Sequence, residues 1–289
     1  MKCTVEQKDR IVSERFHSFC DFVILSPNNP FMSAPGKTLI GYCKTDYIMW
    51  FFKKCQENPD TKYVLVTHQS DYPITAEIFY QKPHNIIKWY GQNIDHFHPI
   101  LESIPIGSHV STWIGTERDA DITHHPDFVV MPETGAEKKY KNLAYMDFGI
   151  WTNTAHRRKV YDFFKNKDWV TSRRCDIKLG QYKDSAESTT IAQQCQNIYD
   201  HKFIISPLGN GFDCGRNWLS LYLGSVPVIP WHKNIEFYMD LPIIVYRDIE
   251  EVTEEFLNKR YDEISSKEFN LDKAKVSYWV ERFREHKKA

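Results

Sequence analysis

The sequence has no apolar run that approaches the roughly 18 residues needed to cross a membrane as a helix. Its first residues, Met1 to Lys8, also lack the apolar stretch that a secretory signal requires. We therefore expect no membrane span, and a cytoplasmic protein that works without an anchor.

Cysteine spacing and net charge exclude several further classes. The chain has 7 cysteines, an odd number, and no pair has the Cys-x-x-Cys spacing typical of zinc sites and redox pairs. A zinc site and a disulfide framework are therefore not expected. The formal net charge is −1, which does not point to a nucleic-acid-binding surface, and we expect no nucleic-acid partner.

Motifs for metals and dinucleotides are also missing or weak. No Gly-x-Gly-x-x-Gly with an acidic residue about 20 positions later follows the first predicted strand, which argues against a dinucleotide oxidoreductase. Asp119 and Asp121 form an Asp-x-Asp pair, but no strong strand precedes them. His124 and His125 are adjacent and do not share a face. We expect a solvated loop at 116–140, and no metal or other cofactor.

The most regular pattern lies in residues 203–231. The run 203–206 predicts a buried strand, and apolar residues at helical spacing follow at Trp218, Leu221 and Tyr222. Gly224 is placed as the C′ residue that ends this helix, and a second apolar run at 226–231 predicts another strand. Such a βαβ unit belongs to a doubly wound parallel sheet.

The turn between that strand and that helix carries the candidate chemistry. Gly209 and Gly211 allow a ligand to approach the backbone closely. Asp213 can cap the helix, and Arg216 adds a cation in the first helical turn. A Gly-rich turn at a helix N-terminus with a cation predicts an anion site, most often for phosphate. The alternative is an ordinary tight turn with Arg216 on a solvated face.

Short apolar runs and helical spacings alternate along most of the chain. They predict strands at 22–25, 38–42, 63–66, 86–90, 100–104, 142–148, 169–171 and 243–246, and helices at 46–54, 155–164, 188–199, 249–259 and 271–288. We predict an α/β protein with two Rossmann-like domains. With a linker at 132–141, the domains are 1–138 and 139–268, followed by a terminal helical segment at 269–289.

Two groups of polar side chains are placed to act with the Gly-rich turn. His68, Ser70 and Asp71 follow the strand at 63–66, and polar residues at the carboxyl ends of parallel strands line ligand crevices. Arg157 and Arg158 lie in the first turns of the helix at 155–164, which Asn153 can cap. Cations there interact unfavourably with the positive end of the helix dipole. A phosphate bound nearby would offset this cost, so the arginines favour a phosphate site. The alternatives are a cap and turn for the first group and surface charge for the second.

The segment 206–228 resembles the donor-sugar-binding segment of exostosin-like glycosyltransferases. Their pattern is roughly Ser-Pro-x-Gly-x-Gly-x-Asp, then Arg-x-Trp-Glu-x-Leu, then Val/Ile-Pro-Val/Ile. The matching residues are Ser206, Pro207, Gly209, Gly211, Asp213, Arg216, Trp218, Leu221, Gly224, Pro227 and Val228. Leu219 stands where the family usually has a Glu that helps to hold the donor nucleotide. Residues 67–71, 88–93 and 105–107 are similar to segments of the family's acceptor-side domain.

The resemblance implies the GT-B architecture, in which two Rossmann-like domains face a cleft and the C-terminal helix crosses back to the first domain. It also implies an inverting transfer of a sugar from a nucleotide-diphosphate donor to a hydroxyl of an oligosaccharide or glycan, without a metal. The chain is similar in size to compact exostosin-like enzymes of large algal viruses, which act in the infected host cell. UDP-xylose is therefore the first donor to consider among the UDP-sugars that exostosins use.

Residue roles follow from the same resemblance together with the turn chemistry. The expected donor-binding residues are Arg157, Arg158, Ser206, Gly209, Asn210, Gly211, Asp213 and Arg216. The expected general base is Asp71, with His68 second and Asp95 third. The alternative is a catalytically silent nucleotide-sugar-binding module, which the missing Glu at Leu219 favours.

Overall fold

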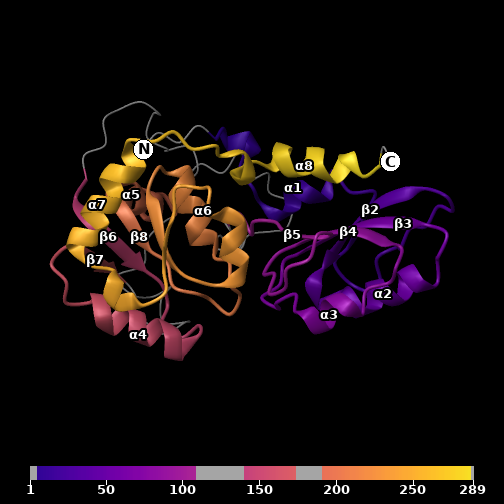
Figure 1. The fold of residues 1–289 in the computed structure, drawn as a ribbon, viewed down its shortest axis with the longest axis horizontal. Helices are drawn as coiled ribbons and strands as arrows, with labels where there is room; N and C mark the ends of the chain where they lie inside the picture. Colours follow the sequence, from indigo (N-terminus) through magenta and orange to yellow (C-terminus); the bar gives the residue numbers. More distant parts are fainter. Residues whose placement is uncertain (1–4, 109–139, 174–190, 288–289) are drawn as a thin grey trace.

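The computed structural model describes residues 5–108, 140–173 and 191–287. In this part of the chain the fold is a mixed α/β fold with two five-stranded sheets. We call residues 5–108 the N-terminal lobe and the described residues from 140 to 271 the C-terminal lobe. The lobes lie side by side in Figure 1, the N-terminal lobe in indigo and magenta and the C-terminal lobe in pink, orange and yellow.

The sheet of the N-terminal lobe has the strand order β1-β2-β3-β4-β5, and every neighbouring pair is parallel. The strands are β1 (Phe22–Ile24), β2 (Thr38–Lys44), β3 (Lys62–His68), β4 (Ile86–Gly91) and β5 (Leu101–Ser103). The central strands are apolar and buried on both faces, as parallel strands require.

Helices cover both faces of this sheet. Residues that point to one face, such as Leu65 and Trp89, pack with α2 (Ile48–Gln56) and α3 (Ala76–Tyr80). Residues that point to the other face, such as Val66, pack with α1 (Ser13–His17) and with α8 (Val276–Glu285). One cover of the first sheet is therefore supplied from the far end of the chain.

The sheet of the C-terminal lobe has the order β10-β9-β8-β6-β7 and is also parallel throughout. Its strands are β6 (Asn142–Asp147), β7 (Val170–Arg173), β8 (His201–Ile205), β9 (Val226–Pro230) and β10 (Ile244–Tyr246). Strand β7 adds to one side of β6, and β8, β9 and β10 add to the other. The order therefore reverses between β6 and β8, and ligands bind at the carboxyl ends of the strands at such a point.

The helices of the C-terminal lobe also cover both faces of their sheet. Helices α4 (Thr154–Phe164) and α7 (Glu254–Ser265) pack on one face, through residues such as Phe164 and Leu257. Helix α5 (Ile191–Tyr199) packs on the other face through Ile198, and α6 (Gly215–Tyr222) packs there through Leu219. This arrangement leaves the loops at the strand ends to form a site.

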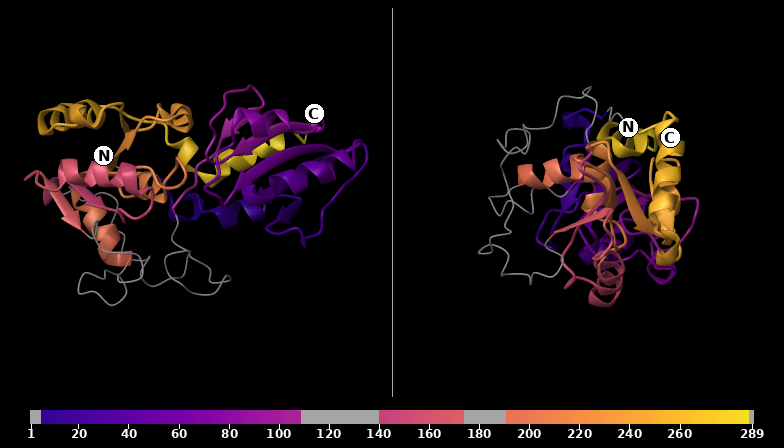
Figure 2. Two further views of the ribbon diagram at one scale, coloured as in Figure 1. Left: turned by 90° about the horizontal axis from the view of Figure 1, so that it is seen from below. Right: turned by 90° about the vertical axis from the view of Figure 1, so that its left-hand side faces the viewer.

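Helix α8 lies along the N-terminal lobe in each of the perpendicular views (Figures 1 and 2). The Phe283 ring lies 5.6 Å from that of Phe16, and Arg282 forms a 2.6 Å ion pair with Glu102 on β5. The Tyr90 hydroxyl on β4 donates to the Arg282 carbonyl at 3.2 Å. Apolar and polar contacts thus both hold α8 on the first sheet.

The two lobes share one apolar cluster and several buried hydrogen bonds. Val66 of β3, Trp218 of α6 and Trp279 of α8 belong to the same cluster. Asn234 is fully buried, and its Oδ1 accepts from the Ile94 amide at 2.8 Å and from Ser103 Oγ at 2.7 Å. The interface between the lobes is therefore packed like the interior of a protein.

The predicted strands and most predicted helices are confirmed, with three corrections to helix boundaries. The helix expected at 46–54 starts later, because residues 45–47 form a 3-10 turn and α2 begins at Ile48. The helix expected at 249–259 is wrong at its start, because Thr253 caps α7 by accepting from the Phe256 amide at 3.1 Å. The helix expected at 271–288 is interrupted by Lys275, whose backbone is extended (φ −109°), so α8 begins at Val276.

Several predictions fall on residues that the structure does not describe. The domain boundary at 138/139, most of the linker at 132–141, the Asp119/Asp121 pair and His124–His125 all lie outside the described residues. Within the described ranges, no helix is both long and apolar enough to span a bilayer. The cysteines of those ranges, Cys20, Cys43, Cys55, Cys195 and Cys214, all carry free thiols.

Candidate functional site

The predicted anion-binding turn follows β8, beside the point where the strand order reverses. We call residues 207–214 the Gly-rich loop. Two of its main-chain carbonyls accept hydrogen bonds from side chains: Leu208 O accepts from Arg157 Nε at 2.7 Å, and Gly209 O accepts from Asn153 Nδ2 at 2.9 Å. The main-chain amides of Asn210, Gly211 and Phe212 donate to no residue that the structure describes. The loop is thus fixed through its carbonyls. Asn210 is exposed, whereas Gly211 is buried.

Two of the predicted arginines, Arg157 and Arg216, lie near one aromatic ring at the reversal point. The guanidinium carbons of Arg157 and Arg216 lie 5.9 and 5.6 Å from the centre of the Phe148 ring, which follows β6. Arg216 Nε donates to Asp147 O at 3.2 Å, and its side chain is only half-buried. Arg216 therefore places a half-buried positive charge at the carboxyl edge of the sheet.

Arg157 is more deeply placed than a surface charge would be. It is 7% exposed, and its Nη1 donates to Gly149 O at 2.8 Å in addition to the bond to the Gly-rich loop. Arg158, next to it, is half-buried and lies 5.8 Å from the Trp151 ring. Arg157 therefore holds the loop in place, while Arg158 and Arg216 are more open to solvent.

Ser206, directly after β8, is a buried polar residue next to this loop. Its side chain is 1% exposed and donates to Asn217 Oδ1 at 2.6 Å. Ser206 Oγ also lies 3.4 Å from Arg216 Nη1, from which it accepts. Ser206 thus orients a cation of the site from within the fold.

Asp213 does not cap helix α6, contrary to the prediction. The N-cap position is Cys214, and no side chain caps the helix there. The Asp213 carboxylate instead accepts from the Ile106 amide of the other lobe at 2.7 Å and from Trp218 Nε1 at 2.8 Å. Burial raises the pKa of Asp213 to about 6, although these hydrogen bonds oppose the rise. Asp213 therefore ties the two lobes together.

Gly211 allows the two lobes to approach each other closely. A Cβ on Gly211 would lie 2.5 Å from Asn93 Nδ2 in the N-terminal lobe, which is closer than atoms can pack. The Asp213 amide donates to Asn93 Oδ1 at 2.9 Å. The Gly-rich loop is thus seated directly on Asn93.

On the N-terminal lobe, the loop after β3 faces the Gly-rich loop. We call residues 69–72 the Asp71 loop. Asn210 Nδ2 donates to Asp71 Oδ2 at 3.3 Å, which joins the two predicted halves of the site across the lobes. Both side chains are exposed, so a dissolved molecule can reach this contact.

The other two candidate bases are placed differently from Asp71. His68 is the last residue of β3 and is fully buried, and its Nε2 lies 2.9 Å from Pro105 O, to which it must donate because a carbonyl only accepts. Asp95 is half-buried and pairs with Lys233 of the other lobe at 3.2 Å. Of the three candidate bases, Asp71 alone is exposed beside the Gly-rich loop.

Leu219, at the position of the family Glu, packs into an apolar cluster. It lies against Tyr145, Ile198 and Ile204 on one face of the second sheet. This half-buried side chain contributes to the core of the lobe. The position therefore offers no polar contact to a nucleotide in this chain.

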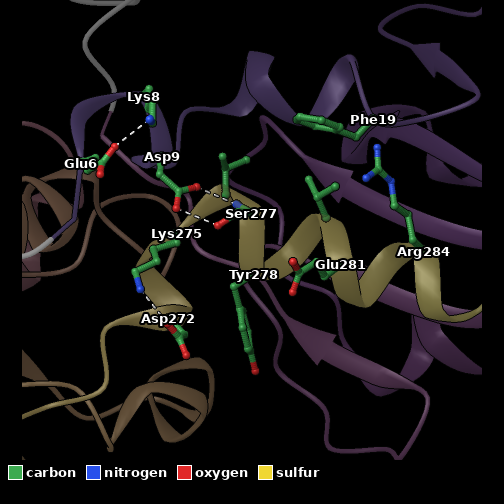
Figure 3. A pocket seen from close by; sticks show the side chains of 12 residues that line it. Glu6, Lys8, Asp9, Phe19, Asp272, Lys275, Ser277, Tyr278, Glu281 and Arg284 are labelled. Carbon is green, nitrogen blue, oxygen red and sulfur yellow. Dashed lines mark hydrogen bonds and ion pairs between the residues drawn. The ribbon is translucent and has the colours of Figure 1, made fainter.

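A separate groove of about 740 Å³ lies between the N-terminal segment and α8 (Figure 3). Its charged side chains are largely satisfied by one another: Glu6 pairs with Lys8 at 2.9 Å, and Asp9 accepts from the Ser277 hydroxyl at 2.7 Å. It shares no lining residue with either loop described above. The candidate site is therefore assigned to the strand ends, where unused donors and cations gather.

Sequence reasoning missed the residues that join the two loops. Gln92 and Asn93 directly follow β4, at the same edge of the sheet as the Asp71 loop. The rule that polar residues at strand ends line sites applies to them as well, and could have singled them out. No group of three or more His, Cys, Asp or Glu side chains able to hold a metal occurs in the described ranges.

Comparison of the chain with protein-family models and with curated proteins finds no match.

Proposed function

We propose that this protein is an inverting glycosyltransferase with the GT-B arrangement, using a nucleotide-diphosphate sugar as donor. The observation that carries the proposal is the contact of Asp71 with Asn210, 3.3 Å across the lobes. It places an exposed carboxylate from one lobe beside the Gly-rich loop of the other. An inverting transfer needs this pair of functions: a base for the acceptor and a site for the leaving diphosphate.

The donor side of the proposal rests on the C-terminal lobe. The unused amides at 210–212 and the Arg216 guanidinium provide the donors and the positive charge that a diphosphate requires. The loop lies at the reversal of strand order, where open α/β sheets bind nucleotides. The resemblance to exostosins favours a UDP-sugar, and UDP-xylose is the first donor to test.

In the proposed reaction, the oxygen of an acceptor hydroxyl attacks the anomeric carbon of the donor sugar. The bond from that carbon to the β-phosphate oxygen breaks, and the nucleoside diphosphate leaves with the bonding electron pair. Asp71 takes the proton of the acceptor hydroxyl as the new glycosidic bond forms. Arg216 and the loop amides stabilise the charge on the leaving diphosphate. His68 is unsuited to the base role because it is fully buried.

Calorimetry and thermal unfolding with UDP, GDP, CMP and their common sugars, with and without EDTA, test the donor site. Binding to the folded state raises its stability by about 2.7 kcal/mol at a hundredfold excess over the dissociation constant. We expect a shift with uridine nucleotides that EDTA does not change. The absence of a shift with every nucleotide would refute the proposal.

Asp71→Asn separates catalysis from binding. The amide keeps the shape of the carboxylate but cannot accept the acceptor's proton, so we expect transfer to fall at least a hundredfold. The dissociation constant of UDP should stay within about threefold, because Asp71 lies outside the Gly-rich loop. Donor binding without any transfer by the wild type would instead indicate a silent binding module.

A further inference from the structure

Asn93 occupies an unusual position between the two loops of the site. Its side chain is fully buried, and its backbone is left-handed, with φ 58°. Asn tolerates this conformation better than most residues, but a non-glycine residue adopts it in a folded protein only where its surroundings hold it there. The surroundings of Asn93 come from both lobes.

The two ends of the Asn93 amide contact different lobes. Oδ1 accepts from the Asp213 amide of the Gly-rich loop at 2.9 Å, and Nδ2 donates to Ser70 O of the Asp71 loop at 3.0 Å. One neighbour is an N–H group and the other is a carbonyl, so only one orientation of the amide satisfies both. Asn93 is therefore a directional link between the loops.

Both loops are shaped around this link. Gly211 leaves the space that the Asn93 amide fills, since a Cβ there would lie 2.5 Å from Nδ2. On the other side, Ser70 O also accepts from Gln92 Nε2 at 3.1 Å, and the Gln69 amide donates to Gln92 Oε1 at 3.1 Å. The backbone that leads into Asp71 is thus held on two sides by residues that follow β4.

We propose that Asn93 is a positioning residue that sets the place of the Asp71 carboxylate relative to the Gly-rich loop. This inference rests on the proposed function, because it assigns Asn93 to the reaction through Asp71. A ligand that orders the Gly-rich loop also orders Asp213 and, through Asn93, the backbone at Ser70. The base is then aligned when the donor is in place.

Asn93→Asp tests the link with minimal change of shape. The carboxylate can still accept from the Asp213 amide, but it cannot donate to Ser70 O, which would face a second acceptor. Asn58→Asp is the control. Asn58 lies in the same lobe but precedes β3, whereas the Asp71 loop follows that strand, and the variant also loses one amide-to-carbonyl bond, from Asn58 Nδ2 to Lys54 O at 2.9 Å. For both variants we would measure the UDP dissociation constant, the acceptor KM, kcat and the unfolding temperature.

We expect Asn93→Asp to lower kcat at least tenfold while the UDP dissociation constant stays within threefold. Asn58→Asp should change only the unfolding temperature. A folded Asn93→Asp variant with wild-type kcat would overturn the positioning role and leave the proposed function intact. If the wild-type protein bound no nucleotide, the proposed function would fail, and this inference with it.

A double-variant cycle tests the contact even if Asn93→Asp does not fold. Gly211→Ala places a methyl group where the Asn93 amide lies, so it should lower both kcat and the unfolding temperature. Asn93→Ala removes the amide, and the added methyl group should then cost little more in the double variant. An equal loss from Gly211→Ala in both backgrounds would show that the two loops are not linked through Asn93.

Discussion

At the scale of single residues, Asp213 shows how burial and hydrogen bonding compete. Its carboxylate is 6% exposed, yet each of its hydrogen-bond partners in the described residues, among them Ile106 N and Trp218 Nε1, is a donor. Donors favour the charged form, whereas loss of water favours the neutral form. Burial is the larger effect, so the pKa of Asp213 rises to about 6.

This shift predicts a pH-dependent stability. The folded state binds the Asp213 proton more tightly than the unfolded state does. The resulting contribution to the free energy of unfolding is therefore fully present below pH 3.8 and is lost as pH rises through 6. A shift of this size corresponds to about 3 kcal/mol. Asp213→Asn removes the titration and turns an amide toward the Ile106 or Trp218 donor. We therefore expect its cost to unfolding free energy to be larger at pH 4.5 than at pH 7.

Chemical denaturation of wild type and Asp213→Asn at both pH values checks this expectation. Other titrating groups, such as His232, whose pKa burial lowers to about 4, are present in both proteins and cancel in the difference. A cost that is equal at the two pH values would mean that Asp213 is not protonated in the folded protein near pH 4.5.

Part of the site could be predicted from residues close together in the sequence. Asp71 and Asn210 follow predicted strands, and parallel strands place their carboxyl ends at one edge of each sheet. The partner of Asp213 could not be predicted, because Ile106 lies 107 positions away in the other lobe. His68 was misleading because it is still inside β3, where its side chain points into the core.

At the scale of elements, the β8–α6–β9 unit matches its prediction closely. Gly224 has φ 71° and directly follows Leu223, the C-cap residue of α6, so it occupies the C′ position. The five-residue helices α1 and α3 could not be predicted, because so short a segment shows no clear helical period. Local sequence patterns were therefore sufficient to predict the long elements and insufficient to predict the short ones.

Gly224→Ala should destabilise the protein by about 1 kcal/mol, because a side chain is disfavoured in the left-handed region. For a chain of this size we expect the unfolding temperature to fall by about 2 °C. Gly149→Ala is the control, since a Cβ there meets no atom within 4 Å and its φ is not in that region. Equal melting of the two variants would contradict this role for Gly224.

At the scale of the whole molecule, the lobes are joined by buried polar contacts as well as by apolar core. Asp213 and Asn234 both accept hydrogen bonds from main-chain amides of the other lobe. Separating the lobes would leave these groups without partners unless water replaced them. Large hinge motions of the kind that open many two-domain enzymes are therefore costly here.

We accordingly expect little change in overall dimensions when a nucleotide binds. Small-angle X-ray scattering with and without saturating UDP should give the same radius of gyration within error. A decrease of several ångströms on binding would contradict this expectation. A nucleotide that does not bind in calorimetry serves as the control for buffer effects.

The position of α8 has a consequence for the protein during its synthesis. Strands β2 to β4 leave the ribosome long before the helix that covers one of their faces, since Tyr90 and its partner Arg282 are 192 residues apart. At about 5–20 residues per second, the interval is about 10–40 s. For that time this apolar sheet face lacks the cover of α8 and can pack only against α1 and the N-terminal segment, while the second lobe can already fold.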